Sequence, residues 1–273
     1  MTTVTIQSGP RNARTDPETG MRYYRWQGRE LPSVTSIRRM AGLPFGLHNW
    51  SIGEVIEHAL QNTFTFNDRM LGLNGGDPEA EAALIRHELR AAATAKRDAA
   101  AELGTAVHDA AAAGRMLEEV DEELRPRLAQ YLDWLSVSKA VVIGAEFQVF
   151  NLAVGYAGTI DLLCQFADGS VWLVDLKTGK GVYSEHDIQI AAYAHAEFVG
   201  ADDVVDQWLT DWLHAVTRCA VLHLADDGWE FIALTPDDGA WEAFCGLLAF
   251  SVWTRDHAAV ESFTEAIRTG VAT

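Results

Sequence analysis

The chain has 273 residues, of which 48% are hydrophobic and 22% are charged, and its formal net charge is −18. This composition is typical of a globular domain with a substantial core, and the excess of acidic residues excludes a broad basic surface for nucleic acid. No run of eighteen apolar residues predicts a transmembrane helix, and the polar first twenty residues lack the apolar core of a secretion signal, so we expect a cytoplasmic protein without a membrane partner.

The first forty residues carry a charge opposite to that of the rest of the chain. They contain seven arginines against three acidic residues, a local charge of +4, which makes them one candidate for contact with a polyanion. A short hairpin is expected to turn at Gln27-Gly28, with Trp26 beside it as a candidate for stacking on nucleic-acid bases. A helix should follow, capped by Ser33 and ended by Gly42.

Between residues 43 and 138 the pattern is mostly helical. A helical segment over 43–62 leads to a predicted loop over 65–78, because Asn-Gly-Gly-Asp-Pro favours turns. From Pro78 to Gly114 the chain is rich in Ala, Glu and Arg, and Gly104 predicts a break that divides this stretch into two helices. A further amphipathic helix is expected over 119–138.

The second half of the chain changes to strand-forming residues. Gly155 and the turn sequence Ala-Asp-Gly-Ser separate three apolar segments, which predicts an antiparallel meander of three strands over about 140–179. A helix over 184–200, a second hairpin turning at Asp227-Gly228 and a closing helix from about residue 236 should follow. This order of elements predicts an α/β fold with a mixed sheet.

The cysteines exclude two kinds of cofactor site. The chain has three of them, far apart and without a C-x-x-C pair, so neither a zinc ribbon nor a cysteine-held iron–sulfur cluster is expected. Buried free thiols in a reducing cytoplasm are the simplest interpretation of Cys164, Cys219 and Cys245.

Two aspartates and a lysine interrupt two of the predicted strands. Asp175 and Lys177 are two residues apart, so their side chains share one face of a strand. The turn near residue 168 lies midway between Asp161 and Asp175, which places these carboxylates opposite each other across the ladder. Opposed carboxylates repel unless a cation lies between them, and their oxygens suit Mg²⁺ or Mn²⁺. With an ammonium group nearby, these are the components of metal-assisted phosphodiester hydrolysis.

Two predicted helices add polar side chains that could face this group. Gln189 and Tyr193 are four residues apart and share a helix face. His108 lies between Gly104 and Ala112, each one turn away, and such small residues let a helix pack closely on a sheet. A buried structural histidine and a core tyrosine are the alternatives for His108 and Tyr193, and a strand-end ion pair is the alternative for Asp175 with Lys177.

The order of these segments resembles the PD-(D/E)XK nuclease superfamily. The segments that carry the resemblance are GTAVH, AEFQVF, GTID, then DLKTG after thirteen residues, and QIAAY. They are similar to the RecB-like branch, which contains the RecB nuclease domain, CRISPR-associated RecB-like exonucleases and many phage exonucleases. The resemblance covers about residues 97–195, and LPSVTSI at 31–37 resembles a segment near the start of related phage proteins.

The resemblance implies a restriction-endonuclease-like core, in which helices flank a mixed central sheet with an antiparallel meander. We expect one domain over 1–273, with an N-terminal hairpin and helical elaboration over 1–95, the nuclease core over 96–235 and a C-terminal helical segment over 236–273. The implied activity is that of a metal-dependent DNA nuclease, an exonuclease of DNA recombination, repair or phage DNA processing. DNA is the implied partner, with a helicase, a single-strand-binding protein or a recombinase as candidate further partners, in a bacterial or phage-infected cell.

The same resemblance assigns a role to each matched side chain. The implied ligands of Mg²⁺ or Mn²⁺ are His108, Asp161 and Asp175. Lys177 would position the attacking water. The residues that would support the site or contact DNA are Glu146, Gln189 and Tyr193.

Three other interpretations account for parts of the sequence. A catalytically silent DNA- or protein-binding module with the same fold should have lost Asp161, Asp175 or Lys177, and all three are present. An acidic protein that mimics DNA would not need a lysine between strand carboxylates. A phosphate-binding loop at Lys-Thr-Gly-Lys-Gly lacks the required G-x-x-x-x-G-K-[ST] spacing. The sequence therefore favours the nuclease, with the silent module as the alternative.

Overall fold

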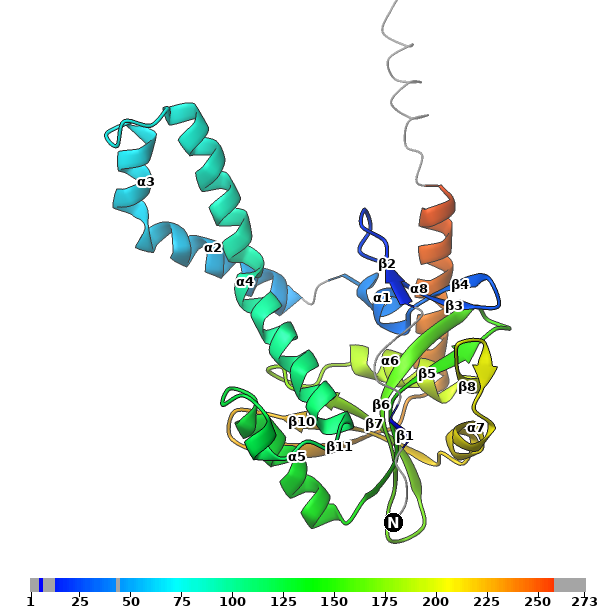
Figure 1. The fold of residues 1–273 in the computed structure, drawn as a ribbon. Coiled ribbons are helices and arrows are strands. Elements are labelled where there is room, and N and C mark those ends of the chain that lie inside the picture. Colours follow the sequence, from blue (N-terminus) through cyan, green and yellow to red (C-terminus); the bar gives the residue numbers. More distant parts are fainter. Residues whose placement is uncertain (1–4, 7–12, 43–44, 258–273) are drawn as a thin grey trace, which may run out of the picture. The chain divides into compact units, whose positions relative to one another are not determined.

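The computed structural model describes residues 5–6, 13–42 and 45–257 of the chain (Figure 1). The chain divides into two compact units, residues 42–107 and the remainder. The described part of the smaller unit is helical, whereas the larger unit contains two β-sheets and the helices that pack on them. Among the described residues, no helix is long and apolar enough to cross a membrane.

The larger unit is organised around an eight-stranded mixed sheet. Its strands are β1 (Thr5–Ile6), β5 (Val141–Asn151), β6 (Tyr156–Gln165), β7 (Val171–Lys177), β8 (Phe198–Ala201), β9 (Val204–Val205), β10 (Arg218–Leu224) and β11 (Trp229–Leu234). The order is β11-β10-β7-β6-β5-β8-β9, and β1 pairs with β5 beside this path. The β10–β7 and β1–β5 pairs are parallel, and the other pairs are antiparallel. A mixed sheet flanked by helices confirms the predicted fold class.

Strands β5, β6 and β7 form the predicted antiparallel meander. In the turn between β6 and β7, the Asp168 carboxylate accepts a hydrogen bond of 2.9 Å from the Ser170 backbone N–H. Leu162 pairs with Val174 across the ladder, and the same register continued by one residue aligns Asp161 with Asp175. The register predicted from the position of the turn is therefore confirmed.

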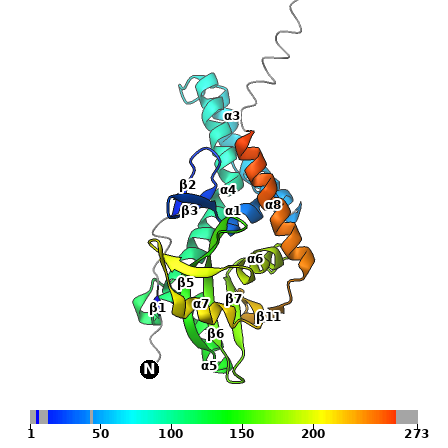
Figure 2. The ribbon, with the colours of Figure 1, turned by 90° about the vertical axis from the view of Figure 1, so that its right-hand side faces the viewer.

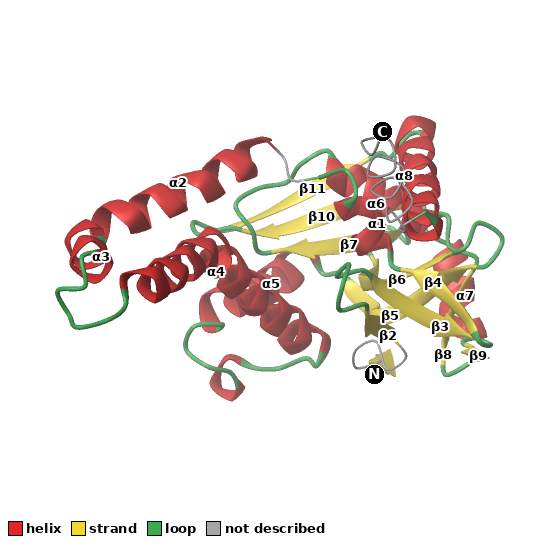
Figure 3. Ribbon diagram, turned by 90° about the horizontal axis from the view of Figure 1, so that it is seen from above, coloured by secondary structure: helices red, strands yellow, loops and turns green. Residues whose placement is uncertain are grey.

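Helices pack on both faces of β7. The helices of the larger unit are α1 (Val34–Arg39), α5 (Arg125–Ser138), α6 (Glu185–Ala194), α7 (Gln207–His214) and α8 (Asp238–Asp256), with a short 3₁₀-helix, η1 (Leu117–Glu119). Leu173 of β7 packs in the cluster that contains Ile190 of α6, and Trp172 packs on Phe231, which stacks on Trp134 of α5. Because successive strand residues point to opposite faces, α5 and α6 cover opposite faces of the sheet here. Figure 3 shows β7, β10 and β11 side by side.

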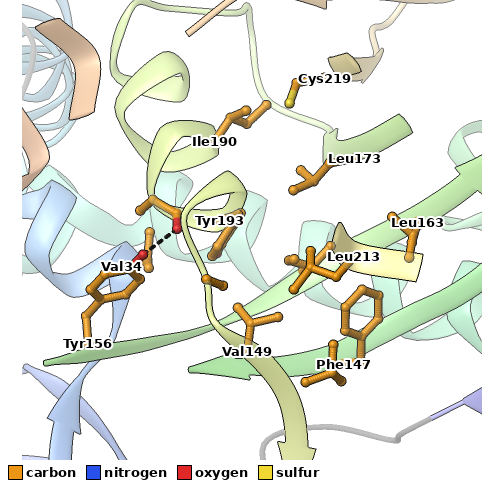
Figure 4. Packing of buried hydrophobic residues seen from close by; sticks show 14 of the residues in the cluster. Val34, Phe147, Val149, Tyr156, Leu163, Leu173, Ile190, Tyr193, Leu213 and Cys219 are labelled. Carbon is orange, nitrogen blue, oxygen red and sulfur yellow. Dashed lines mark hydrogen bonds between the residues drawn. The ribbon is translucent and has the colours of Figure 1, made fainter. Parts of the chain in front are cut away.

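The main hydrophobic core lies between this sheet and α1, α6, α7 and α8. Helices α1, α6 and α8 pack against one another (Figure 2). Figure 4 shows side chains of this cluster, including Tyr156, whose hydroxyl donates a hydrogen bond of 2.7 Å to the Ala192 carbonyl of α6. This bond ties α6 to β6, so the helix that carries Gln189 and Tyr193 is fixed relative to the meander.

The N-terminal segment forms a three-stranded antiparallel sheet, with β2 (Ala13–Thr15), β3 (Arg22–Trp26) and β4 (Arg29–Pro32). The turn at Gln27-Gly28 is confirmed, with both residues at positive φ. Ser33 is confirmed as the helix cap, because its hydroxyl accepts a hydrogen bond of 3.0 Å from the Ser36 N–H.

The expectation that Trp26 stacks on nucleic-acid bases is wrong. Its side chain is only 3% exposed, and its ring lies 4.7 Å from those of both Phe150 and Phe198. The alternation of the strand turns Trp26 inward and Arg25 outward. Trp26 therefore joins the N-terminal sheet to the main sheet.

The smaller unit differs from the sequence expectation in two places. Its helices are α2 (Phe45–Gln61), α3 (Thr63–Met70) and α4 (Pro78–Ala112), the last of which continues into the larger unit. The loop predicted from residue 65 begins only after Met70. Gly104 does not divide α4, because one glycine costs only about 1 kcal/mol in a helix and the surrounding Ala, Glu and Arg residues favour it.

Two further boundaries were predicted wrongly in the larger unit. The helix predicted over 119–138 begins at Arg125, where Pro126 in the first turn favours a helix start. The helix predicted to reach Gly200 ends at Ala194, because residues 198–201 form β8 instead and pair with β5 and β9. Helix α7, capped by the Asp206 side chain, was not predicted.

Close packing at Gly158 of β6 generates a prediction. A Cβ atom there would lie 2.6 Å from Cε1 of Tyr193 and 3.1 Å from Cγ2 of Val34. We expect Gly158→Ala to lower the free energy of unfolding by about 1–3 kcal/mol, because overpacking forces neighbouring side chains to move. Urea unfolding measures this effect.

The matched control for this substitution is Gly246→Ala in α8, where an added Cβ meets no atom within 4 Å. Helix propensity should make this variant more stable than the wild type by up to about 1 kcal/mol. Equal stability of the two variants would contradict the packing described for Gly158.

Candidate active site

The larger unit brings all the predicted site residues to the meander and the two helices beside it. They are His108 on α4, Glu146 on β5, Asp161 on β6, Asp175 and Lys177 on β7, and Gln189 and Tyr193 on α6. Hydrogen bonds and ion pairs connect these side chains in two groups, one around His108 and one around Asp175. The charge on Asp161 acts on Asp175, so the two groups are electrostatically coupled.

The first group is a candidate metal site. Nδ1 of His108 lies 3.2 Å from Oε1 of Glu146 and 3.5 Å from Oδ1 of Asp161. The three side chains offer ligand atoms that all lie within 4.8 Å of one another. An imidazole nitrogen and two carboxylates form a donor set that suits a divalent cation. Asp175, a predicted ligand, is not one of these three, whereas Glu146 is.

Glu146 has an unusual backbone conformation. Its φ is 48°, although it lies inside β5 between Ala145 and Phe147, which pair with Leu162 and Ile160. A residue other than glycine in this left-handed region costs roughly 1–2 kcal/mol. Such strain is common at functional sites, and here it accompanies a carboxylate that contacts His108.

Asp161 is held as a carboxylate. Its Oδ2 accepts a hydrogen bond of 2.7 Å from the Leu176 backbone N–H. Burial alone would raise its pKa, but the charges of His108 and Lys177 and this hydrogen bond outweigh burial and lower the pKa to about 2. The side chain therefore stays ionised at neutral pH and is ready to bind a cation.

His108 carries a proton in the absence of a metal ion. Burial opposes its charge, but the two carboxylates of Asp161 and Glu146 outweigh burial and raise its pKa to about 10. Burial raises the pKa of Glu146, and the hydrogen bond from His108 opposes that rise. A metal ion that binds Nδ1 must therefore displace a proton.

The second group surrounds Asp175, which is 1% exposed. Its Oδ2 lies 2.5 Å from Nζ of Lys177, and its Oδ1 accepts a hydrogen bond of 3.0 Å from Nε2 of Gln189. Burial and the charge of Asp161 raise the pKa of Asp175 to about 6, against the opposing effect of Lys177. Nε2 of Gln189 also lies 3.2 Å from the Tyr193 hydroxyl, so Tyr193 orients the glutamine.

Two side chains near the site were not singled out from the sequence. Gln148 lies two residues after Glu146, is 3% exposed, and its Oε1 has no hydrogen-bond partner among the described residues. His186 is on the first turn of α6, three residues before Gln189, and its Nδ1 accepts a hydrogen bond of 3.0 Å from the Tyr183 N–H. The sequence signal for Gln148 was a polar residue within an apolar strand. The signal for His186 was its position three residues before Gln189 in the same predicted helix.

Comparison with known proteins gives one informative result. The family model described as "PD-(D/E)XK nuclease superfamily" matches residues 21–204, which is more than half of the chain. No curated protein sequence matches the chain significantly. The solved structure described as "Crystal structure of SSO0001" matches 46% of this chain with 13% identity and a TM-score of 0.29, and the match covers 56% of its own length. A structural likeness this weak supports no inference.

The left-handed conformation of Glu146 can be tested with two variants that both remove the carboxylate. Glycine in a strand is usually about 0.5–1 kcal/mol less stable than alanine. At position 146 we expect the order to reverse, with Glu146→Gly about 0.5–1 kcal/mol more stable than Glu146→Ala, because only glycine adopts positive φ without cost. Urea unfolding of the two variants measures the difference.

Thr159 of β6 serves as the control position for this comparison, since its φ is not positive. There, the alanine variant should be more stable than the glycine variant. If alanine were the more stable residue at both positions, Glu146 would not be strained in the folded protein.

The ion pairing of His108 predicts a pH dependence of stability in metal-free protein. Its pKa in the folded state, about 10, exceeds the ordinary value of 6.5. Its contribution to stability is therefore complete below pH 6.5 and is lost as the pH rises through 10. We expect the stability advantage of the wild type over His108→Gln to shrink by about 1 kcal/mol or more between pH 6 and pH 10.

Denaturant unfolding in EDTA at several pH values provides the measurement. His87→Gln, at an exposed position of α4, is the control and should differ from the wild type equally at every pH. A constant difference for His108→Gln as well would show that His108 is not paired with the two carboxylates.

Proposed function

The chain belongs to the PD-(D/E)XK nuclease superfamily, and from this premise we propose that it is a metal-dependent deoxyribonuclease of the RecB-like branch, an exonuclease that hydrolyses phosphodiester bonds. The observation that supports the proposal most directly is that a lysine lies beside the candidate metal site. Asp161 contacts His108 and also accepts a hydrogen bond from Leu176, the residue next to Lys177. A proposed metal ligand and an ammonium group therefore lie on adjacent strands.

The proposed metal ligands are His108, Glu146 and Asp161, with Asp175 as the further ligand expected from the sequence. The mutual distances of the first three, within 4.8 Å, fit a single divalent ion, and we propose Mg²⁺ or Mn²⁺ because two of the ligands are carboxylates. Bound there, the ion would polarise the scissile phosphate and lower the pKa of a water molecule. Asp161 is already ionised, whereas His108 must lose a proton before its Nδ1 can bind the ion.

Lys177 is proposed to orient the attacking water and to offset the negative charge that develops on the phosphate. Its ammonium group is held by Asp175, which keeps it beside the carboxylates. Gln189 positions Asp175 through one hydrogen bond, and its Oε1 is buried without a partner among the described residues.

The proposed biological setting is DNA recombination, repair or phage DNA processing in the cytoplasm. A helicase, a single-strand-binding protein or a recombinase would be the proposed partner there. The support for this setting is the sequence resemblance to RecB-like and phage exonucleases.

The proposed function predicts metal-dependent cleavage that requires two specific side chains. End-labelled single- and double-stranded DNA is incubated with the protein in Mg²⁺, Mn²⁺ or EDTA, and the products are resolved by size. Asp161→Asn and Lys177→Ala should each reduce the cleavage rate by about 100-fold or more, because each removes an interaction with the reacting phosphate or water. EDTA should abolish cleavage.

The matched control for Asp161→Asn is Asp168→Asn in the turn of the same hairpin. The asparagine amide would keep an oxygen that can accept the Ser170 hydrogen bond, so full activity is expected. Cleavage in EDTA, or undiminished cleavage by either site variant, would overturn the proposed mechanism. Release of single nucleotides would support an exonuclease, and internal fragments would support an endonuclease instead.

A further inference from the structure

Arg38, at the end of α1, forms an ion pair beside the candidate active site. Its Nη1 lies 3.2 Å from Oε1 of Glu185, the first residue of α6, and the two side chains are 18% and 28% exposed. Helices α1 and α6 pack against each other. Glu185 lies four residues before Gln189 and therefore on the same side of α6. Arg38 is thus near the helix face that reaches Asp175 through Gln189.

The hydrogen bonding of Arg38 is incomplete. Its Nε is buried, and no acceptor for it is present among the described residues. Arginine offers five N–H donors in a planar fork that matches two oxygens of a phosphate or a carboxylate. The Glu185 contact uses Nη1 and leaves Nε unsatisfied, although native proteins rarely leave such a donor unpaired. The guanidinium is therefore suited to a further acceptor.

Arg38 and Lys177 act together on one neighbouring side chain. His186 is 5% exposed, and burial together with the charges of Lys177 and Arg38 lowers its pKa to about 3. His186 is therefore neutral, and its Nδ1 accepts the Tyr183 N–H. Two cations from α1 and β7 thus approach the same uncharged imidazole.

We propose that Arg38 binds a DNA phosphate next to the scissile one, and that Glu185 occupies the guanidinium when DNA is absent. The proposal rests on the proposed nuclease function and adds a substrate contact to it. A phosphate would provide two oxygens for the guanidinium fork, and a shift of the Arg38 side chain away from Glu185 would let one of them reach the buried Nε. The Glu185 carboxylate holds the guanidinium through Nη1 and repels an incoming phosphate, so it weakens DNA binding while it keeps Arg38 in place.

The competition predicts opposite effects for the two partners of one ion pair. Arg38→Ala should weaken DNA binding about tenfold and reduce the slope of log affinity against log salt by about one, because one phosphate contact is lost. Glu185→Gln should tighten binding about two- to tenfold, because a competing charge is removed. Arg38→Ala combined with Glu185→Gln should bind like Arg38→Ala alone. Arg38→Lys should be intermediate, since lysine keeps the charge and loses the fork.

Binding is measured by fluorescence anisotropy with labelled single- and double-stranded DNA in EDTA at several salt concentrations, so that cleavage does not interfere. Steady-state cleavage in Mg²⁺ or Mn²⁺ adds KM and kcat, and the Arg38 variants should raise KM more than they lower kcat. Arg127→Ala and Asp226→Asn are the controls, because this ion pair joins α5 to the β10–β11 turn instead. Both controls should bind DNA like the wild type.

The outcomes separate this proposal from the proposed function. If the wild type cleaves DNA and Arg38→Ala binds it with unchanged affinity and salt slope, the role of Arg38 is overturned and the nuclease stands. Weaker binding by both Arg38→Ala and Glu185→Gln would mark the ion pair as purely structural and also overturn it. A wild type that neither binds nor cleaves DNA would overturn both proposals.

Discussion

Repulsion among three carboxylates is the constraint around which the candidate site is built. Glu146, Asp161 and Asp175 come from three adjacent strands, and their side chains are only 16%, 12% and 1% exposed. Buried charges of one sign are costly unless cations lie among them. His108 and Lys177 supply those cations in the absence of metal. If a divalent ion replaced the His108 proton, the three negative charges of the carboxylates would be balanced by the two positive charges of the ion and the one of Lys177.

The fold brings the carboxylates and the cations together from segments that are far apart in the sequence. The meander supplies the carboxylates, the end of α4 supplies His108, and the tie between Tyr156 and Ala192 fixes α6 against β6. Two costs accompany this arrangement: the left-handed backbone at Glu146, and the Nε of Arg38, which has no acceptor in the part of the chain that the structure describes. The first is at a residue that would bind the metal ion, and the second is at a residue that would bind the substrate. A well-packed core around Phe147 and Tyr193 provides the stability that offsets them.

Local patterns predicted the meander and much of the site, and long-range contacts explain the rest. The Ala-Asp-Gly-Ser turn fixes the ladder register, so the alignment of Asp161 with Asp175 followed from sequence alone. The Glu146 side chain that contacts His108 has a positive φ inside a strand, which no sequence pattern indicates. Arg38 and Glu185 lie 147 residues apart, and Trp26 is buried against aromatic rings of β5 and β8, far along the chain. At Gly104 the summed helix propensity of the neighbouring residues outweighs one glycine, whereas at residues 198–201 strand pairing overrides the local helical pattern.

The hairpin between β6 and β7 also limits how this chain can change in length. The two aspartates stand in register only because the turn lies midway between them. Loss or gain of one residue on a single arm would shift the ladder by one position and direct the following side chains to the opposite face. Tolerated insertions should therefore be confined to the tip of the hairpin or occur as compensating changes on both arms. In this chain, the number of residues between the two aspartates therefore determines whether their side chains face each other.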